Sequence, residues 1–180
     1  MDLVEKAKEA AAQRAVDNHI KHVTYTLQNN YIVGIGSGST VVYAVEHLAR
    51  RVKEHGWKIS CVPTSFQAKE LIRKHGLVMT DLEESPELNV AIDGADEIDA
   101  KLTLIKGGGG CLTQEKIIAS CAKEFVVVAD YRKDSSTLGV NLQSRMKFPL
   151  SVTTGPHFFA ACRNSALCPS SFSIFLCTGT

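Results

Sequence analysis

The chain has almost no excess charge, no long apolar run and no paired cysteine motif. Its 180 residues include 20 basic and 19 acidic side chains, for a formal net charge of +1. Such a balance creates no overall field that attracts nucleic acid or an anionic membrane, so any anion binding has to be local. The longest apolar stretches, such as residues 125–129, are far shorter than the roughly 20 residues of a membrane-spanning helix. We therefore expect a protein that binds neither nucleic acid nor a membrane.

The amino-terminal segment also lacks the continuous apolar core of a secretory signal, so we expect a cytoplasmic protein. The six cysteines include no Cys-x-x-Cys pair and no histidine at zinc spacing, which predicts reduced thiols rather than disulfides or a zinc site. One of them, Cys111, lies beside a glycine run and is a conceivable nucleophile. Because no histidine is near it in the sequence, a small space-filling role fits it better.

Apolar segments of strand length alternate with helix-like segments over most of the chain. Apolar residues at helical spacing predict helices at 2–20, 40–55, 64–75 and 113–123, the third opening with the capping-box spacing of Thr64 and Gln67. Short apolar runs predict strands at 31–34, 58–62, 77–79, 88–92, 102–105 and 125–129. This alternation predicts an α/β fold, a Rossmann-like and mostly parallel sheet with helices on both faces. Ligands bind at the carboxyl ends of the strands in such sheets.

The first motif, Gly34-Ile-Gly-Ser-Gly-Ser-Thr40, joins a predicted strand to a predicted helix. Backbone N–H groups of Gly38, Ser39 and Thr40 then point into one concavity, where the start of a helix favours an anion. No lysine precedes the Ser-Thr pair as it does in a P-loop, and Ser39 stands where the dinucleotide fingerprint needs its third glycine. A monophosphate therefore fits better than a nucleotide, with the Ser37 hydroxyl as a further donor. The alternative is an ordinary tight turn.

The second motif, Asp93-Gly-Ala-Asp-Glu-Ile-Asp99, places four acids in seven residues after a predicted strand. Three interpretations stay open: a metal site, a cluster that binds hydroxyls and moves protons, and a solvated charged loop. The calcium-loop pattern is absent and no histidine is nearby, which weakens the metal interpretation. The small residues Gly94 and Ala95 let a ligand approach the backbone, which shifts the balance toward the substrate-binding interpretation.

The third motif places Lys106 before four glycines, and Glu115 follows in the first turn of a predicted helix. Each glycine is roughly 0.5–1 kcal/mol less favourable than alanine in a regular element, so a purely structural role explains the run poorly. A flexible linker is disfavoured because the run lies between a strand and a helix and lacks serine. Lys106 is then a fixed cation and Glu115 a candidate base, although the helix dipole alone also favours a glutamate at this place.

In this order and at this spacing, the three motifs resemble those of the type A ribose-5-phosphate isomerases. Residues 63–68 and 128–134 are similar to that family as well, and the likeness runs to about Gly139, over more than three quarters of the chain. The resemblance implies an enzyme of the pentose phosphate pathway that interconverts ribose 5-phosphate and ribulose 5-phosphate through an enediolate. It also implies that the reaction needs no metal and no organic cofactor.

The resemblance implies roles for individual residues. Glu115 is expected to be the general base, Lys106 to stabilise the oxyanion together with glycine N–H groups, and Asp93 to shuttle a hydroxyl proton. The stretch 147–150 resembles the family's entry into its second domain, and Lys147 there matches a substrate-contacting lysine. The substrate contacts expected in total are Ser37, Gly38, Ser39, Thr40, Asp93, Gly94, Ala95, Asp96, Lys106, Gly107, Gly108, Gly109 and Lys147.

The carboxyl end departs from the family pattern. Residues 151–180 contain a single charged residue, Arg163, and resemble no part of the family. We therefore divide the chain into a Rossmann-like catalytic domain at 1–150 and a low-charge tail at 151–180, a candidate for disorder. With the family's small second α+β domain largely missing, a truncated or variant isomerase competes with a non-catalytic sugar-phosphate-binding module and with an inactive product. A homo-oligomer is expected if the missing region is not essential for its contacts.

Overall fold

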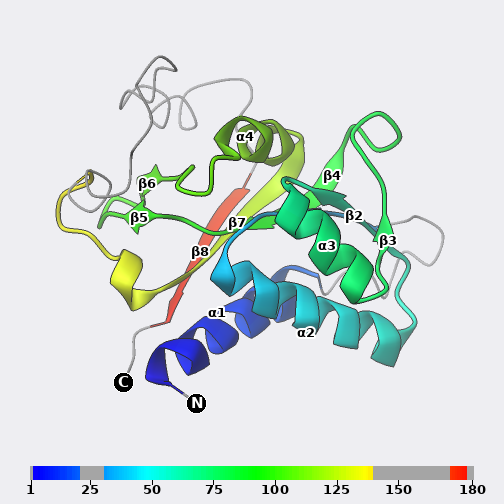
Figure 1. The fold of residues 1–180 in the computed structure, drawn as a ribbon, viewed down its shortest axis with the longest axis horizontal. Coiled ribbons are helices and arrows are strands. Elements are labelled where there is room, and N and C mark those ends of the chain that lie inside the picture. The colour runs from blue at the N-terminus through cyan, green and yellow to red at the C-terminus, as the bar shows by residue number, and fades with distance from the viewer. Residues whose placement is uncertain (1, 21–30, 140–170, 178–180) are drawn as a thin grey trace.

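The computed structural model describes residues 2–20, 31–139 and 171–177, and Figure 1 shows these segments arranged around one sheet. Within them, six strands pair in the order β3-β2-β1-β4-β7-β8, and every pair is parallel. The strands are β1 (Tyr31–Ile35), β2 (Ile59–Pro63), β3 (Val78–Met79), β4 (Leu88–Asp93), β7 (Ala122–Asp130) and β8 (Ser171–Cys177). Two short strands, β5 (Glu97–Ile98) and β6 (Leu104–Ile105), form a separate antiparallel pair.

The described residues also form four α-helices and one short 3-10 helix. They are α1 (Leu3–His19), α2 (Ser39–His55), α3 (Phe66–Lys74), α4 (Leu112–Ser120) and the 3-10 helix η2 (Tyr131–Lys133). Helix α3 begins later than the capping-box spacing predicts, because Ser65 rather than Thr64 is its N-cap and accepts the Ala68 N–H at 3.1 Å. None of the helices in the described part of the chain has the length and apolar character that a membrane span requires.

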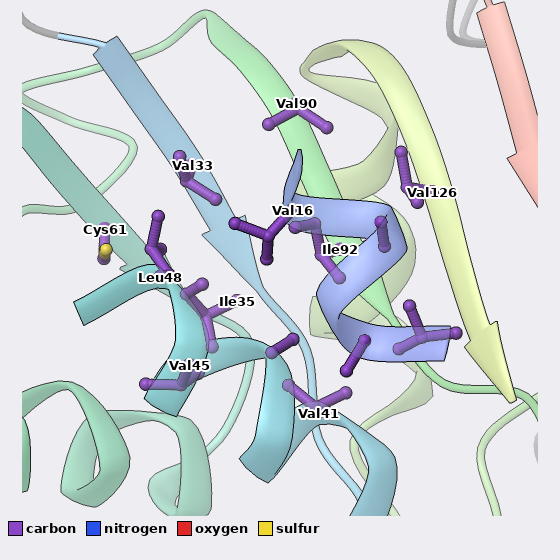
Figure 2. Packing of buried hydrophobic residues seen from close by; sticks show 14 of the residues in the cluster. Val16, Val33, Ile35, Val41, Val45, Leu48, Cys61, Val90, Ile92 and Val126 are labelled. Carbon is purple, nitrogen blue, oxygen red and sulfur yellow. The ribbon is translucent and has the colours of Figure 1, made fainter. Parts of the chain in front are cut away.

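The apolar residues of the strands divide between two clusters, one on each face of the sheet. On the first face, α1, α2 and α3 pack over the central strands; Figure 2 shows Val16 of α1 and Leu48 of α2 among the strand residues Val33, Ile35 and Ile92. On the second face, Ile118 of α4 joins a cluster with residues of the β5–β6 pair. The predicted α/β fold, a mostly parallel sheet with helices on both faces, is confirmed.

The predicted strand at 102–105 is only partly correct. Residues 104–105 form β6, which pairs with β5 and not with the main sheet. The sequence analysis missed β5 because two residues, one of them the acidic Glu97, show no strand periodicity. The glycine motif therefore reaches the rim of the sheet from a hairpin rather than from a strand of the sheet itself.

The segment Ser171–Cys177 forms β8, which lies beside β7 in register from the pair Glu124 and Ser171 to the pair Asp130 and Cys177. The predicted tail at 151–180 contains this strand, to which no secondary structure had been assigned. Its sequence, Ser-Phe-Ser-Ile-Phe-Leu-Cys, is uncharged and rich in apolar residues, as strands of parallel sheets commonly are. The low charge that distinguishes this segment is thus also compatible with sheet pairing, and the domain boundary at residue 150 stays a prediction.

Two neighbouring isoleucines of α4 test how far this helix depends on burial. Ile118 is 1% exposed and Ile117 is 48% exposed, so Ile118→Ala should lower the free energy of unfolding by about 2–5 kcal/mol. Ile117→Ala is the matched control, and its effect should stay within about 0.5 kcal/mol. Urea unfolding followed by circular dichroism measures both. Equal losses for the two variants would contradict the packing of α4 against the sheet.

Candidate active site

The three glycine- and acid-containing motifs meet at one cavity of about 500 Å³ at the rim of the sheet. This volume is in the range of small-molecule sites. Parallel pairing brings the carboxyl ends of β1 and β4 together, and the β5–β6 hairpin carries the third motif to the same place. The sequence-predicted residues that line the cavity are Ser37, Gly38, Ser39, Thr40, Gly94, Ala95, Asp96, Lys106, Gly107, Gly108, Gly109 and Glu115.

At the base of the cavity, one ammonium group lies between two carboxylates. Lys106 Nζ is 2.9 Å from Asp93 Oδ2 and 3.2 Å from Glu115 Oε2, and it donates a hydrogen bond to the Gly94 carbonyl at 2.6 Å. The Lys106 side chain is 10% exposed, and those of Asp93 and Glu115 are 3% and 4% exposed. Opposite charges in such a poorly solvated place interact strongly. The three side chains therefore form one acid–base unit.

This arrangement changes the acidity of Asp93 and Lys106. Burial raises the pKa of Asp93, the nearby Lys106 charge opposes that rise, and the negative charge of Glu115 adds to it, so the pKa lies above its ordinary value. Burial by itself lowers the pKa of Lys106, but the attraction of Asp93 and Glu115 outweighs it and raises the pKa. A cation that stays charged beside a carboxyl group that protonates readily is suited to proton transfer.

The other oxygen of Asp93 is tied to the glycine loop. Asp93 Oδ1 accepts the N–H groups of Ser37 at 3.1 Å and Gly94 at 2.7 Å. The loop passes so close that a Cβ on Gly36 would lie 2.0 Å from this oxygen. Gly36 is therefore required by the close approach of the loop to Asp93, a role that the sequence analysis did not assign.

Glu115 is held through one oxygen and leaves the other without a regular hydrogen bond. Its Oε1 accepts the Ser37 hydroxyl at 2.6 Å. Its Oε2 and the Oδ2 of Asp93 are buried and, within the described residues, accept no hydrogen bond of regular geometry, although both lie at ion-pair distance from Lys106. Buried acceptors are normally satisfied. Of these two residues, Glu115 lines the cavity and Asp93 does not, so a ligand in the cavity would lie against Glu115 and Lys106, with Asp93 behind them.

The predicted anion loop is only partly free to receive a ligand. The Gly38 N–H donates to Gln67 Oε1 at 3.0 Å, so this donor is already engaged by a side chain of α3. Ser39 is exposed and Thr40 is the second residue of α2. The first N–H groups of a helix have no partner within it. The structure therefore places the available donors at Ser39 and Thr40, one step further along the loop than Gly38.

Asp96 binds the backbone of the glycine run directly. Its Oδ2 accepts the Gly108 N–H at 2.7 Å, and a Cβ on Gly108 would lie 2.4 Å from its Oδ1. This contact holds the run close to the acid cluster. It also engages an N–H group that the sequence analysis expected to be free for an oxyanion.

Sequence reasoning missed a second cation of the cavity. Lys133, in η2, lines it together with Ser65, Phe66, Gln67, Cys111, Val128 and Ala129. Asp130 caps η2 by accepting the Arg132 N–H at 3.1 Å, and Arg132 in turn lowers the pKa of this buried carboxyl group. The sequence contained a signal that could have identified Lys133, since this residue belongs to the family-like stretch 128–134. Lys147, the lysine that was proposed instead, lies outside the described residues.

No cluster of three or more histidine, cysteine, aspartate or glutamate side chains in residues 2–20 and 31–139 is arranged to hold a metal ion. The carboxylates of Asp93 and Glu115 are paired with Lys106, and Asp96 accepts the Gly108 N–H. The fold and the site together define a Rossmann-like α/β protein with an acid–base centre at the carboxyl ends of its strands.

Comparisons with known proteins agree with this description. The family model of ribose 5-phosphate isomerase A (phosphoriboisomerase A) matches residues 60–163, and the chain belongs to this family. Ribose-5-phosphate isomerases of Sus scrofa and Homo sapiens are each 55% identical to it over 139 residues. The match covers 77% of this chain but 43% and 42% of those relatives, so the chain spans less than half of their length.

Solved structures of the family share the fold. Ribose 5-phosphate isomerase A of Methanocaldococcus jannaschii is 37% identical with a TM-score of 0.66, over 81% of this chain and 58% of that one. A D-ribose-5-phosphate isomerase in complex with phospho-erythronic acid is 38% identical with a TM-score of 0.67, over 77% of this chain and 57% of that one.

The close approach at Gly36 can be tested by adding one methyl group. Gly36→Ala forces Asp93 or the loop to move, and overpacking of this kind typically costs about 1–3 kcal/mol of stability. Gly94→Ala is the control, because its Cβ would come no closer than 3.3 Å to the Ser37 carbonyl. Neither glycine has a positive φ, so steric contact alone separates the two variants. In thermal unfolding, Gly36→Ala should have a lower melting temperature than Gly94→Ala. The reverse order would contradict the loop geometry.

Proposed function

We propose that the chain carries the site of a ribose-5-phosphate isomerase, which interconverts ribose 5-phosphate and ribulose 5-phosphate. The observation that carries this proposal is the pair of buried carboxylates, Asp93 and Glu115, on either side of Lys106, next to a cavity that Lys106, Glu115 and the glycine loop at Ser37–Thr40 line. A protein that only binds a sugar phosphate has no need of a base. Membership of the family supports the same assignment.

The reaction transfers a proton between two neighbouring carbons of the open-chain sugar. Glu115 takes the proton from C2 of the aldose, and the electron pair moves into a C1–C2 double bond while the carbonyl electrons pass to O1. Lys106 stabilises the negative oxygen, and a donor of this kind is commonly worth about 2.7–4 kcal/mol. Asp93 moves the O2 proton to O1, a role that its raised pKa supports. Glu115 then returns its proton to C1, which gives the ketose.

The substrate spans the cavity from its phosphate to its reacting carbons. Ser39, Thr40 and Lys133 bind the phosphate end, while Asp96 and the backbone of Gly94 and Ala95 lie along the sugar hydroxyls. That a relative was solved with phospho-erythronic acid, a phosphorylated sugar acid, supports a ligand of this chemistry. Holding both ends of the sugar limits its length and places C1 and C2 at Glu115.

The proposed compartment follows from the thiols, and the proposed oligomeric state and domain bounds follow from the family. Cys61, Cys111 and Cys121 are free, and burial raises the pKa of Cys61 to about 12. Such thiols support a reducing compartment, and hence the cytoplasm. The proposal also includes a homo-oligomer and a catalytic domain at 1–150, both of which rest on the resemblance to the family.

Replacing the base tests the activity directly. Glu115→Gln keeps the shape of the side chain but removes its basicity, and it should lower kcat by about 10²- to 10⁴-fold. Gln114→Ala, an exposed change on the same helix, is the control and should leave kcat unaltered. Formation of ribulose 5-phosphate from ribose 5-phosphate by the full chain measures both. Turnover that survives in Glu115→Gln would refute the assignment of the base, and binding without any turnover in the unmodified chain would favour a non-catalytic module.

Lys133 should act on binding rather than on chemistry. Lys133→Ala removes a cation from the phosphate end and should raise KM about tenfold, or about 1.4 kcal/mol, with kcat nearly unchanged. Lys53→Ala, at the far end of α2 from the anion loop, controls for the loss of a positive charge. Steady-state kinetics at low and high salt separate the loss of a phosphate contact from the general loss of a positive charge. An unchanged KM in Lys133→Ala would exclude Lys133 from the phosphate site.

A further inference from the structure

We propose that Ser37 is a positioning residue for the general base and not a ligand of the phosphate. Its hydroxyl donates to Glu115 Oε1 at 2.6 Å, although the two residues are 78 positions apart in the chain. Hydrogen bonds from a hydroxyl to a carboxylate are normally 2.5–2.7 Å long. This assignment rests on the proposed function, since it concerns the residue that acts as base there.

The backbone of Ser37 is held at the end of β4. Its N–H donates to Asp93 Oδ1 at 3.1 Å, and the N–H of the preceding Gly36 donates to the Ile92 carbonyl at 2.8 Å. A Cβ on Gly36 would collide with Asp93, so the loop runs close to the acid here. The Ser37 hydroxyl therefore starts from a backbone whose position is set by Asp93.

A fixed donor restricts the carboxylate that it binds. Glu115 reaches the cavity through three rotatable bonds, and helix α4 alone does not determine where its oxygens lie. The Ser37 hydroxyl holds Oε1, which leaves Oε2 beside Lys106 without a regular hydrogen bond. Oε2 is then the oxygen that takes the carbon-bound proton. A displacement of about 1 Å at such a group can cost about 10²-fold in rate.

Charge argues against a phosphate at Ser37. Both of its donors are engaged by carboxylates, the N–H by Asp93 and the hydroxyl by Glu115. A phosphate dianion at this place would displace those bonds and lie beside two negative groups, which Coulomb repulsion opposes. Ser39, two residues further on, is exposed at the start of α2 and faces no such obstacle. Within this one loop, Ser37 therefore positions the base and Ser39 binds the phosphate.

Three substitutions in the full chain separate these roles. Ser37→Ala should lower kcat about 10- to 100-fold, as the loss of a hydrogen bond to a charged group implies, with KM within about twofold of the unmodified chain. Ser37→Thr keeps the hydroxyl and should recover most of kcat. Ser39→Ala should instead raise KM. The dissociation constant of inorganic phosphate, measured by calorimetry, should rise in Ser39→Ala and stay within about twofold in Ser37→Ala.

The outcomes distinguish this inference from the proposed function. If Ser37→Ala weakens phosphate binding as much as Ser39→Ala does, or leaves kcat unchanged, Ser37 is not the positioning residue. Ser37→Thr controls for misfolding, because it keeps the hydroxyl. If this variant has an unaltered melting temperature but does not recover kcat, the inference is also overturned. If the unmodified chain binds phosphate but does not isomerise, the proposed function fails, and the phosphate comparison still decides whether Ser37 belongs to the phosphate site.

Discussion

The Lys106 ammonium between Asp93 and Glu115 is the interaction on which the site depends. Two carboxylates that are almost fully buried are costly unless a cation compensates them. One cation serves both, so the three groups together carry a negative charge unless a proton is shared. Burial raises the pKa of Asp93, and the attraction of the two carboxylates holds Lys106 in its charged form. The same imbalance that makes this cluster unfavourable as a structural element makes it suitable for moving protons.

The sheet and much of the site could be predicted from the sequence because both depend on local patterns. Apolar runs of four or five residues marked β1, β2, β4 and β7, and parallel pairing then brought their carboxyl ends to one rim. The residues that follow those runs, Asp93 among them, had to meet there. Lys106 follows β6 and Glu115 lies in α4, so the strand pattern alone did not predict that these two residues lie beside Asp93.

The features of the site that could not be predicted from the sequence depend on contacts between distant residues. The bond from Ser37 to Glu115 and the approach of Lys133 to the cavity follow from how the loops pack, and neither leaves a trace in periodicity. The same holds for Gln67, which was read as part of a capping box but reaches across to the Gly38 N–H. Gln67 thus had a plausible local partner, and tertiary structure supplied a different one.

Strand β8 shows how composition can be ambiguous. Absence of charge in residues 171–177 distinguished the tail from the catalytic domain, yet a strand that pairs along its whole length with β7 needs no charge. Backbone pairing is insensitive to side-chain identity, so an apolar segment can satisfy the open edge of β7 without resembling the family. Strand β8 is in turn the edge strand of the described sheet, so its pairing moves the unpaired edge from β7 to β8 and does not remove it. Composition alone therefore could not separate a segment foreign to the catalytic domain from a strand of its sheet.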